Sequence, residues 1–225
     1  MKKDFSAVLL TGGAGAFGRA FLRMAAQTGV KQVTVVSRDE MKHAALRREA
    51  ASDPALRALL RLAIGDICDP DTLRLWMRDA DCVVHAAAMK HVGECEQNVL
   101  ASTRVNVLGT AHVVSAFLQS DCRALVFLST DKSPYSSSAY GAQKYLGERM
   151  VVEAARLSRP EQRAFCLRYS NVMDSTGSVF HIFRDLLRAE KTATVNGAAT
   201  SRGFVTQAQV LQALSQGLAD RKSVV

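Results

Sequence analysis

The chain has 225 residues, of which 48% are hydrophobic and 22% are charged, and its formal net charge is +8. This composition is typical of a globular protein and excludes disordered, collagen-like and mucin-like chains, which have fewer apolar residues or far more glycine and proline. The basic residues are scattered and have no aromatic residues interleaved with them, so the charge favours small anionic ligands over nucleic acid.

Short apolar runs alternate with helical patterns along the first 170 residues. The predicted strands cover residues 5–10, 33–36, 62–64, 82–85, 125–128 and 165–167. Among the helices predicted between them, one starts near residue 17 and ends at Gly29, and the two longest cover 99–118 and 140–157. This alternation predicts an α/β fold, a Rossmann-like doubly wound parallel sheet with helices on both faces. Such sheets bind ligands beyond the carboxyl ends of their strands.

The alternation stops after residue 170. Helices are predicted at 179–190 and 207–219, with a short strand at 193–195 between them. We therefore predict two parts: residues 1–170 as a cofactor-binding domain that carries the catalytic residues, and residues 171–225 as a small, reduced C-terminal substrate-binding lobe.

Three features favour a cytoplasmic protein without a metal site. The N-terminal apolar run, residues 7–10, is too short for the core of a secretory signal, and no run of about 18 apolar residues predicts a membrane span. The five cysteines are odd in number and include no C-x-x-C pair. They therefore indicate buried free thiols rather than disulfides or a metal centre.

A glycine-rich turn joins the first predicted strand to the first helix. Gly13, Gly15 and Gly18 fit the pattern G-x-G-x-x-G, in which glycines allow the backbone to approach a pyrophosphate at a helix N-terminus. The alternative is a glycine-rich turn without a ligand. The residues of this turn that we expect to contact a cofactor are Gly12, Gly13, Gly15, Ala16, Phe17 and Gly18.

The end of the second strand indicates which nicotinamide cofactor is bound. NAD enzymes usually have an acidic residue there, whereas this chain has Ser37 and Arg38 followed by Asp39. Arg38 and Lys42 are suited to the 2′-phosphate of NADP, so we predict NADP, with NAD the less favoured alternative. In the competing interpretation both cations are solvated and Asp39 only caps a helix.

Tyr140 and Lys144 lie one turn apart on a predicted helix face. A nearby ammonium lowers the pKa of a tyrosine from its usual value near 10, so Tyr140 is predicted to take a proton from a sugar hydroxyl as hydride leaves. Ser129 or Thr130, at the end of the fifth strand, would hydrogen-bond the same hydroxyl. The alternative is an amphipathic tyrosine above a surface lysine.

Asp131 and Lys132 add an acid and a base beyond what alcohol oxidation needs. Elimination of water requires a base for the C–H proton and an acid for the leaving hydroxyl. A solvent-exposed turn is the alternative explanation of this pair.

Further residues are expected around the same cleft. His85 is better explained as a buried, hydrogen-bonded histidine than as a catalytic one, and the small residues 86–88 leave room for a flat ring. Lys90 and His91 are either phosphate contacts or loop charges. Asn106 either fixes backbone and water near the site or packs locally.

Taken together, these motifs resemble the extended short-chain dehydrogenase/reductase superfamily. Within it, the chain is most similar to the inverting UDP-N-acetylglucosamine 4,6-dehydratases of bacterial surface-sugar biosynthesis. The matching stretches are 11–18, 37–40, 65–67, 85–92, 106 with 109, 129–132, 140–144 and 167–172, with weaker matches at 177–179 and 200–202. The stretches SRDE, HAAAMKHV and STDK are more specific than the glycine turn.

The resemblance implies a dehydration cycle. Tyr140 deprotonates the C4 hydroxyl while hydride passes to NADP, and the resulting ketone acidifies C5. Lys132 then removes the C5 proton and Asp131 protonates the departing C6 hydroxyl. Hydride returns to C6, and C5 is reprotonated from the opposite face. The resemblance also implies a nucleotide-sugar substrate and a homo-oligomer.

The residues that complete the predicted site follow from the same resemblance. The catalytic set is Tyr140, Lys144, Asp131, Lys132 and Thr130. Besides the glycine turn, Ser37, Arg38 and Lys42, the expected cofactor contacts are Asp66, Ile67, Ala86, Ala87, Ala88, Lys90, Asn106, Ser129, Tyr140 and Lys144. The expected substrate contacts are Lys90, His91, Ser129, Thr130, Tyr169, Asn171 and Arg202.

The chain departs from the family pattern at several places. Ser170 replaces a glycine, serines 136–138 replace the usual proline and asparagine, and the rest of the family's substrate lobe has no counterpart after residue 225. Two other functions therefore stay open. One is an NADP-dependent epimerase or carbonyl reductase acting on a smaller substrate. The other is a non-catalytic NADP-binding regulatory protein. The intact catalytic set argues against this function, because a regulatory protein needs none of those residues.

Overall fold

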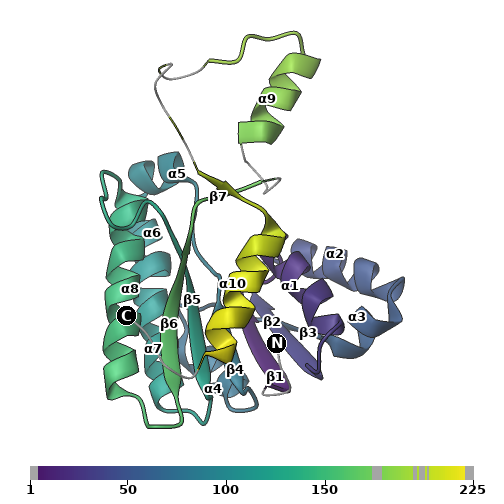
Figure 1. Ribbon diagram of the computed structural model, residues 1–225, viewed down its shortest axis with the longest axis vertical. Helices are drawn as coiled ribbons and strands as arrows, with labels where there is room; N and C mark the ends of the chain where they lie inside the picture. The colour runs from purple at the N-terminus through teal and green to yellow at the C-terminus, as the bar shows by residue number, and fades with distance from the viewer. Residues whose placement is uncertain (1–4, 174–178, 195–196, 198–200, 202, 221–225) are drawn as a thin grey trace.

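The computed structural model describes residues 5–173, 179–194, 197, 201 and 203–220. Its body is a six-stranded parallel sheet in the order β3-β2-β1-β4-β5-β6, with helices on both faces (Figure 1). The strands are β1 Ala7–Thr11, β2 Gln32–Ser37, β3 Leu60–Ile64, β4 Cys82–His85, β5 Ala124–Thr130 and β6 Arg163–Tyr169. The predicted Rossmann-like doubly wound sheet is therefore confirmed.

The helices agree with the sequence pattern wherever they are long. They are α1 Ala16–Ala26, α2 Glu40–Ala51, α3 Pro54–Leu59, α4 Pro70–Met77, α5 Val92–Gln97, α6 Val99–Thr103, α7 Gly109–Leu118, α8 Ala139–Leu157, α9 Val179–Arg188 and α10 Gln207–Ala219. The sequence did not predict α3 and α5, because six residues are too few to show helical periodicity. The first helix ends at Ala26, earlier than the predicted Gly29.

The helix predicted over residues 99–118 contains a π-helical segment. Residues Arg104–Leu108 form this segment between α6 and α7, and the three pieces follow one another without a break. A π turn adds a residue to the helical repeat, so a pattern based on 3.6 residues per turn does not reveal it. Asn106 lies in the middle of this segment.

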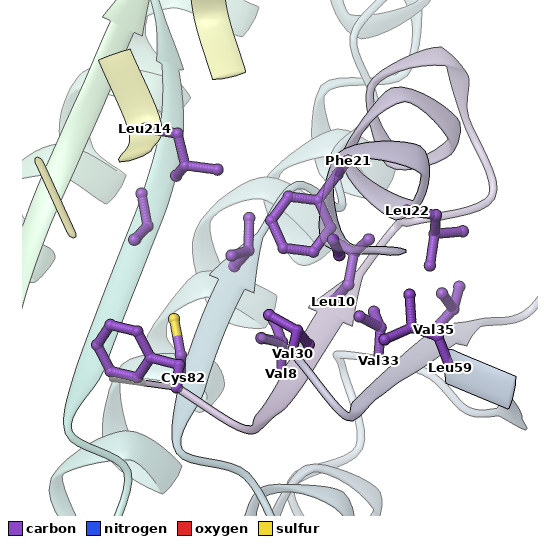
Figure 2. Close-up of a cluster of buried hydrophobic side chains, with 14 of the residues drawn as sticks. Val8, Leu10, Phe21, Leu22, Val30, Val33, Val35, Leu59, Cys82 and Leu214 are labelled. Atoms are coloured by element: carbon purple, nitrogen blue, oxygen red, sulfur yellow. The ribbon is translucent and has the colours of Figure 1, made fainter. Parts of the chain in front are cut away.

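The core lies on both faces of the sheet because side chains of each strand alternate between them. On one face, Val8 and Leu10 pack with Phe21 of α1 (Figure 2). On the other face, Leu9 packs in a cluster with Phe117 of α7. Both faces of the central strands are buried, as expected for a parallel sheet covered by helices.

The last helix, α10, packs on this same body although it falls in the segment predicted as a substrate lobe. Leu214 is buried in the cluster that contains Phe21 and Val8 (Figure 2). Leu218 belongs to the same cluster. Helix α10 begins with a capping box in which Thr206 and Gln209 bond each other's backbone. The division of the chain at residue 170 stays a prediction.

The other described elements of that segment lie beyond the carboxyl edge of the sheet. Strands β7 Asn171–Val172 and β8 Phe204–Val205 form a small parallel pair, and α9 projects beyond it with no buried side chain (Figure 1). Of the strand predicted at 193–195, residues 193 and 194 have no regular structure, and residue 195 lies outside the described residues.

Within the described residues, no helix is both long enough and apolar enough to cross a membrane. The same residues contain no cluster of three or more His, Cys, Asp or Glu side chains suited to a metal ion. All five cysteines are free, and three of them are buried.

Candidate active site

The predicted site residues lie mainly at one edge of the sheet. Because the strands are parallel, the turns after their carboxyl ends open on the same side. The predicted site residues at this edge are those of the glycine turn after β1 and, at or after the ends of the other strands, residues 37–42, 66–67, 86–91, 129–132 and 169–171. Asn106 reaches this region on the π segment, and Tyr140 and Lys144 reach it on α8. Arg202 lies outside the described residues.

The glycine turn leaves the N-terminus of α1 open to a ligand. Gly12 has a φ of +69°, and a Cβ there would lie 2.6 Å from the Cα of Ala87. A Cβ on Gly15 would meet only the Gly12 carbonyl oxygen at 3.8 Å, so this position faces open space. Gly15 begins α1 without a side-chain cap, which leaves backbone N–H groups available. The turn therefore fits a pyrophosphate.

Cations and carboxylates alternate beyond the end of β2. The Arg38 guanidinium contacts Asp66 at 3.3 Å, and the Lys42 ammonium contacts Asp39 at 2.8 Å. The Asp39 carboxylate also accepts from the Lys42 backbone N–H at 2.9 Å, so Asp39 is the N-cap of α2. Burial, together with the charge of Lys42, lowers the pKa of Lys90. Arg38 and Lys42 thus lie beyond the end of β2, each paired with a carboxylate, and Lys90 on the turn after β4 is close enough to be affected by the charge of Lys42.

His85 is fully buried at the end of β4, and both of its ring nitrogens are bonded. Nδ1 lies 2.7 Å from Thr11 Oγ1, and Nε2 lies 3.1 Å from Thr110 Oγ1. The Thr110 hydroxyl donates to the Asn106 carbonyl, so it accepts from an Nε2–H, and Nδ1 accepts from Thr11. Burial lowers the pKa of His85 to about 3. His85 is therefore a neutral structural histidine, as the sequence favoured.

Asn106 holds the backbone that leads to Lys90 and His91. Its Oδ1 accepts from the Met89 N–H at 2.8 Å, and its Nδ2 donates to the Met89 carbonyl at 2.9 Å. The same amide donates to Gln143 on α8 at 2.8 Å. This network connects the turn after β4 to the helix that carries Tyr140.

Tyr140 and Lys144 occupy a more apolar environment than the sequence predicted. The Lys144 ammonium is buried 3.8 Å from the centre of the Phe127 ring, and burial lowers its pKa to about 7. Burial raises the pKa of Tyr140 above its usual value, and Tyr169 and Asp131 raise it further. The predicted lowering of the Tyr140 pKa by Lys144 is therefore wrong for the protein alone. Burial raises the Tyr140 pKa, and the Lys144 side chain, with its own pKa lowered to about 7, is only partly charged at neutral pH.

Asp131 and Lys132 form an ion pair at the end of β5. The Lys132 Nζ lies 3.1 Å from Asp131 Oδ1 and 3.3 Å from Asn171 Oδ1. The other oxygen of Asp131 accepts from the Ser170 hydroxyl at 3.0 Å. Burial would raise the pKa of Asp131, but the bonds from Lys132 and Ser170 outweigh it, so the pKa is lowered. Both side chains are about one-third exposed, so this is a partly buried pair rather than a solvated turn.

The two hydroxyls before this pair are engaged within the protein. The Ser129 hydroxyl donates to Glu148 on α8, and the Thr130 hydroxyl donates to Asp131 Oδ1 at 3.1 Å. The expected contact of either hydroxyl with a sugar stays a prediction.

Sequence reasoning missed Glu148 as a member of this region. Its carboxylate also accepts from Ser133 and from Arg168 on β6. The only signal in the sequence is spacing, because position 148 follows Tyr140 and Lys144 at intervals of four residues. Spacing does not show that a charged side chain is buried.

Comparisons with known proteins identify the family of this chain. A sequence model of the family described as "Polysaccharide biosynthesis protein" matches residues 8–223. The UDP-glucose 4-epimerase of Rickettsia conorii is 34% identical over 200 residues, which cover 87% of this chain and 57% of the relative. The chain therefore spans little more than half of that relative's length.

Solved structures show the same fold. Pen from Bacillus thuringiensis superposes with a TM-score of 0.89 at 30% identity, covering 97% of this chain and 66% of Pen. DesIV from Streptomyces venezuelae, a dTDP-glucose 4,6-dehydratase solved with NAD bound, has a TM-score of 0.80 at 21% identity and covers 96% of this chain and 73% of DesIV. The family match extends over nearly the whole chain, and the sheet order is that of a Rossmann-like fold. This chain belongs to the polysaccharide biosynthesis family of extended short-chain dehydrogenases/reductases.

Proposed function

We propose that this chain binds NADP and catalyses the 4,6-dehydration of a nucleotide-activated sugar, with UDP-N-acetylglucosamine as the first candidate substrate. The observation that carries the proposal is the Asp131–Lys132 pair, whose charged atoms lie 3.1 Å apart at the carboxyl edge of the sheet. Oxidation of an alcohol requires one base, whereas loss of water requires a second base and an acid. The pair supplies both groups.

Proton transfer within the pair produces the two forms that elimination needs. When a proton moves from Lys132 Nζ to Asp131 Oδ1, the products are a neutral amine and a neutral carboxylic acid. A bound sugar favours this neutral state, because both charges lose water when the site is covered. The amine then removes the C5 proton while the acid protonates the departing C6 hydroxyl. The ion pair is restored at the end of the step.

Tyr140 takes the proton of the C4 hydroxyl at the start of the reaction. A bound nicotinamide would accept hydride from C4 and later return it to C6. Burial holds the pKa of Tyr140 high, so a positive charge is needed to form the phenolate. Lys144 supplies this charge in its protonated form, one helical turn away. With its own pKa near 7, this form is present at neutral and lower pH.

The cations beyond β2 support NADP as the cofactor. Arg38 is 60% exposed at the end of this strand, and Lys42 and Lys90 repel each other nearby. A 2′-phosphate would relieve that repulsion, whereas the ribose hydroxyl of NAD would not. Titration of the protein with NADP⁺ and NAD⁺ measures the preference.

Epimerisation at C4 is the second candidate, and the R. conorii relative favours it by name. Epimerisation also begins with oxidation at C4, but the hydride returns to C4 on the opposite face of the sugar. Epimerisation therefore does not require the Asp131–Lys132 pair. A regulatory role without catalysis requires neither this pair nor Tyr140.

Product mass separates these functions. The purified protein is incubated with UDP-N-acetylglucosamine and NADP⁺ in deuterated water. Dehydration predicts a product that has lost one water and carries solvent deuterium at C5. A product with the composition of the substrate, apart from exchange, would support epimerisation instead.

Tyr140→Phe is the matched control for this experiment. We expect this variant to bind NADP⁺ like the wild type and to form neither reduced cofactor nor product. Turnover by Tyr140→Phe would contradict the assignment of the base. Tight NADP⁺ binding without turnover of any nucleotide sugar by the wild type would favour the regulatory role.

A further inference from the structure

One buried carboxylate, that of Glu148 on α8, collects hydroxyl and guanidinium donors from two other elements. Its side chain is 6% exposed. Oε1 accepts from the Ser129 hydroxyl, from the Ser133 hydroxyl at 2.7 Å and from Arg168 Nε at 3.0 Å. Oε2 accepts from the other arm of the same guanidinium. Although burial opposes it, this set of donors holds the pKa of Glu148 below its usual value, so the group is an anion.

The two serines flank the proposed acid–base pair, Ser129 near the end of β5 and Ser133 in the turn after it. Ser129 precedes Thr130, and Ser133 follows Lys132. Both hydroxyls are buried, and both reach the same oxygen atom of Glu148. One carboxylate oxygen therefore connects the end of β5 to the turn that follows it, where the Ser133 hydroxyl also lies 2.9 Å from the Thr130 carbonyl oxygen.

Glu148 also belongs to the helix face that presents the proposed base. Tyr140, Lys144 and Glu148 follow one another at intervals of four residues on α8, so they lie along one side of the helix. Arg168 extends the connection to β6, whose chain continues into Ser170 and Asn171. Those two side chains contact Asp131 and Lys132. Glu148 thus joins the helix of the base to the turn of the acid.

We propose that Glu148 is a positioning residue that holds the Asp131–Lys132 pair in register with Tyr140 and so controls the elimination of water more than the oxidation at C4. This inference rests on the proposed dehydration. The Glu148 carboxylate contacts only protein groups and takes no part in proton transfer.

Helix α8 has other anchors, so loss of Glu148 should loosen the turn rather than the helix. Gly147 packs directly on the Phe127 ring, and Lys144 lies over the same ring. Val151 and Ala154 are fully buried in the core beneath the helix. Arg168 is 46% exposed, so its guanidinium can turn to water if the carboxylate is removed.

The test compares Glu148→Leu with Glu153→Leu, the same change at an exposed position of the same helix. Two rates are measured on each protein: formation of reduced nicotinamide in a single turnover, and formation of dehydrated product. For Glu148→Leu we expect the first rate to stay within about threefold of the wild type. The second should fall about a hundredfold, the effect of misplacing a catalytic group by about 1 Å, so that reduced cofactor accumulates. Equal losses in both rates, or unchanged dehydration, would overturn the proposal.

Two further variants keep the test decisive if Glu148→Leu folds poorly. Ser133→Ala removes the bond from the turn to Glu148 and leaves the Glu148–Arg168 pair intact, so dehydration should slow while nicotinamide reduction persists. Glu148→Gln keeps an oxygen acceptor for both serines and should recover most of the rate lost in Glu148→Leu. A variant Ser133→Ala that dehydrates at the wild-type rate would contradict the proposal.

A readout without substrate separates this proposal from the proposed function. The charged and titratable groups facing Asp131 are Lys132 and Tyr140, and Ser170 donates to it. If Glu148→Leu loosens the turn, Asp131 loses part of these contacts and its pKa rises toward the ordinary value. Carbon-13 NMR of labelled aspartate follows this titration against the Glu153→Leu control. An unchanged Asp131 titration would refute positioning by Glu148, whereas a wild type that only epimerises would refute dehydration.

Discussion

Gly12 and Gly15 belong to the same turn but have different surroundings. Gly12 has a left-handed backbone and its Cα hydrogen faces the Ala87 backbone, so a side chain there is both strained and blocked. Gly15 has an ordinary φ and faces open space at the start of α1. A side chain at Gly15 therefore meets a bound phosphate before it meets the protein.

This difference predicts that Gly15→Ala separates cofactor binding from folding. We expect the urea midpoint of Gly15→Ala to match that of the wild type, and its affinity for NADP⁺ to fall about tenfold or more, which corresponds to about 1.4 kcal/mol. Binding is measured by isothermal titration calorimetry.

Gly12→Ala is the contrasting variant. Strain and overpacking together should lower its free energy of unfolding by about 2–4 kcal/mol even without cofactor. If Gly15→Ala bound NADP⁺ as tightly as the wild type, the turn would not be the site of the pyrophosphate.

Single residues also show where prediction from sequence ends. The motifs predict Tyr140, Lys144, Asp131 and Lys132 as site residues because residue type and spacing can be taken directly from the sequence. Protonation is not readable, since it depends on burial that the whole fold creates, and the raised pKa of Tyr140 is the example. The sequence does not predict the burial of Glu148 for the same reason, because an acidic residue on a helix is usually solvated. Only the packed structure brings Arg168 and two serines to its carboxylate.

At the scale of elements, the π segment places Asn106 where it can serve two neighbours. Its side chain makes three hydrogen bonds, two to the Met89 backbone and one to Gln143. All are shielded from water at least in part, so their loss leaves polar groups without partners. The segment thus joins the turn after β4 to α8.

We predict that Asn106→Ala lowers the free energy of unfolding by about 3 kcal/mol, or about 1 kcal/mol for each lost bond. Urea denaturation without cofactor measures this change. Asn98→Ala is the control, because the exposed Asn98 amide makes one bond, to the Glu94 carbonyl, and should cost less than about 1 kcal/mol. Equal losses in the two variants would mean that the Asn106 network adds nothing to stability.

The elements themselves were predicted in proportion to their length and regularity. The six strands and the long helices were found because apolar alternation and periodicity extend over enough residues. The structure extends β5 to Thr130 and β6 to Tyr169, which moves the predicted catalytic turn to the very end of the sheet. The two six-residue helices and the π segment depend on local geometry that has no periodic signature.

At the scale of the whole molecule, apolar side chains are exposed along two packed elements. Leu100 and Leu108 lie on the helical run 99–118 and are 88% and 52% exposed. Tyr145 and Leu146 are exposed on α8, which packs against the π segment. Exposed apolar residues on neighbouring elements are typical of an interface, and on this basis we propose the homo-oligomer that the family resemblance implies.

We predict that the wild type sediments as an oligomer at micromolar concentration and that Leu108→Glu shifts it toward the monomer. A buried charge without a partner opposes association, which gives the direction of the effect. Leu75→Glu is the control, because Leu75 is equally exposed but lies on α4. A monomeric wild type in analytical ultracentrifugation would contradict the proposed oligomer.

The parallel pairing of β7 and β8 has a mechanical consequence. Parallel strands cannot be joined by a tight turn, so a longer crossover that contains α9 connects Val172 to Phe204. The pairing of β7 with β8 brings the two ends of this crossover together. One end is Asn171, whose amide oxygen contacts Lys132, and the other leads through Thr206 into α10, which packs on the main body. The β7–β8 pair therefore connects the Lys132–Asn171 contact to the start of α10, so a displacement of one strand would be transmitted to the other.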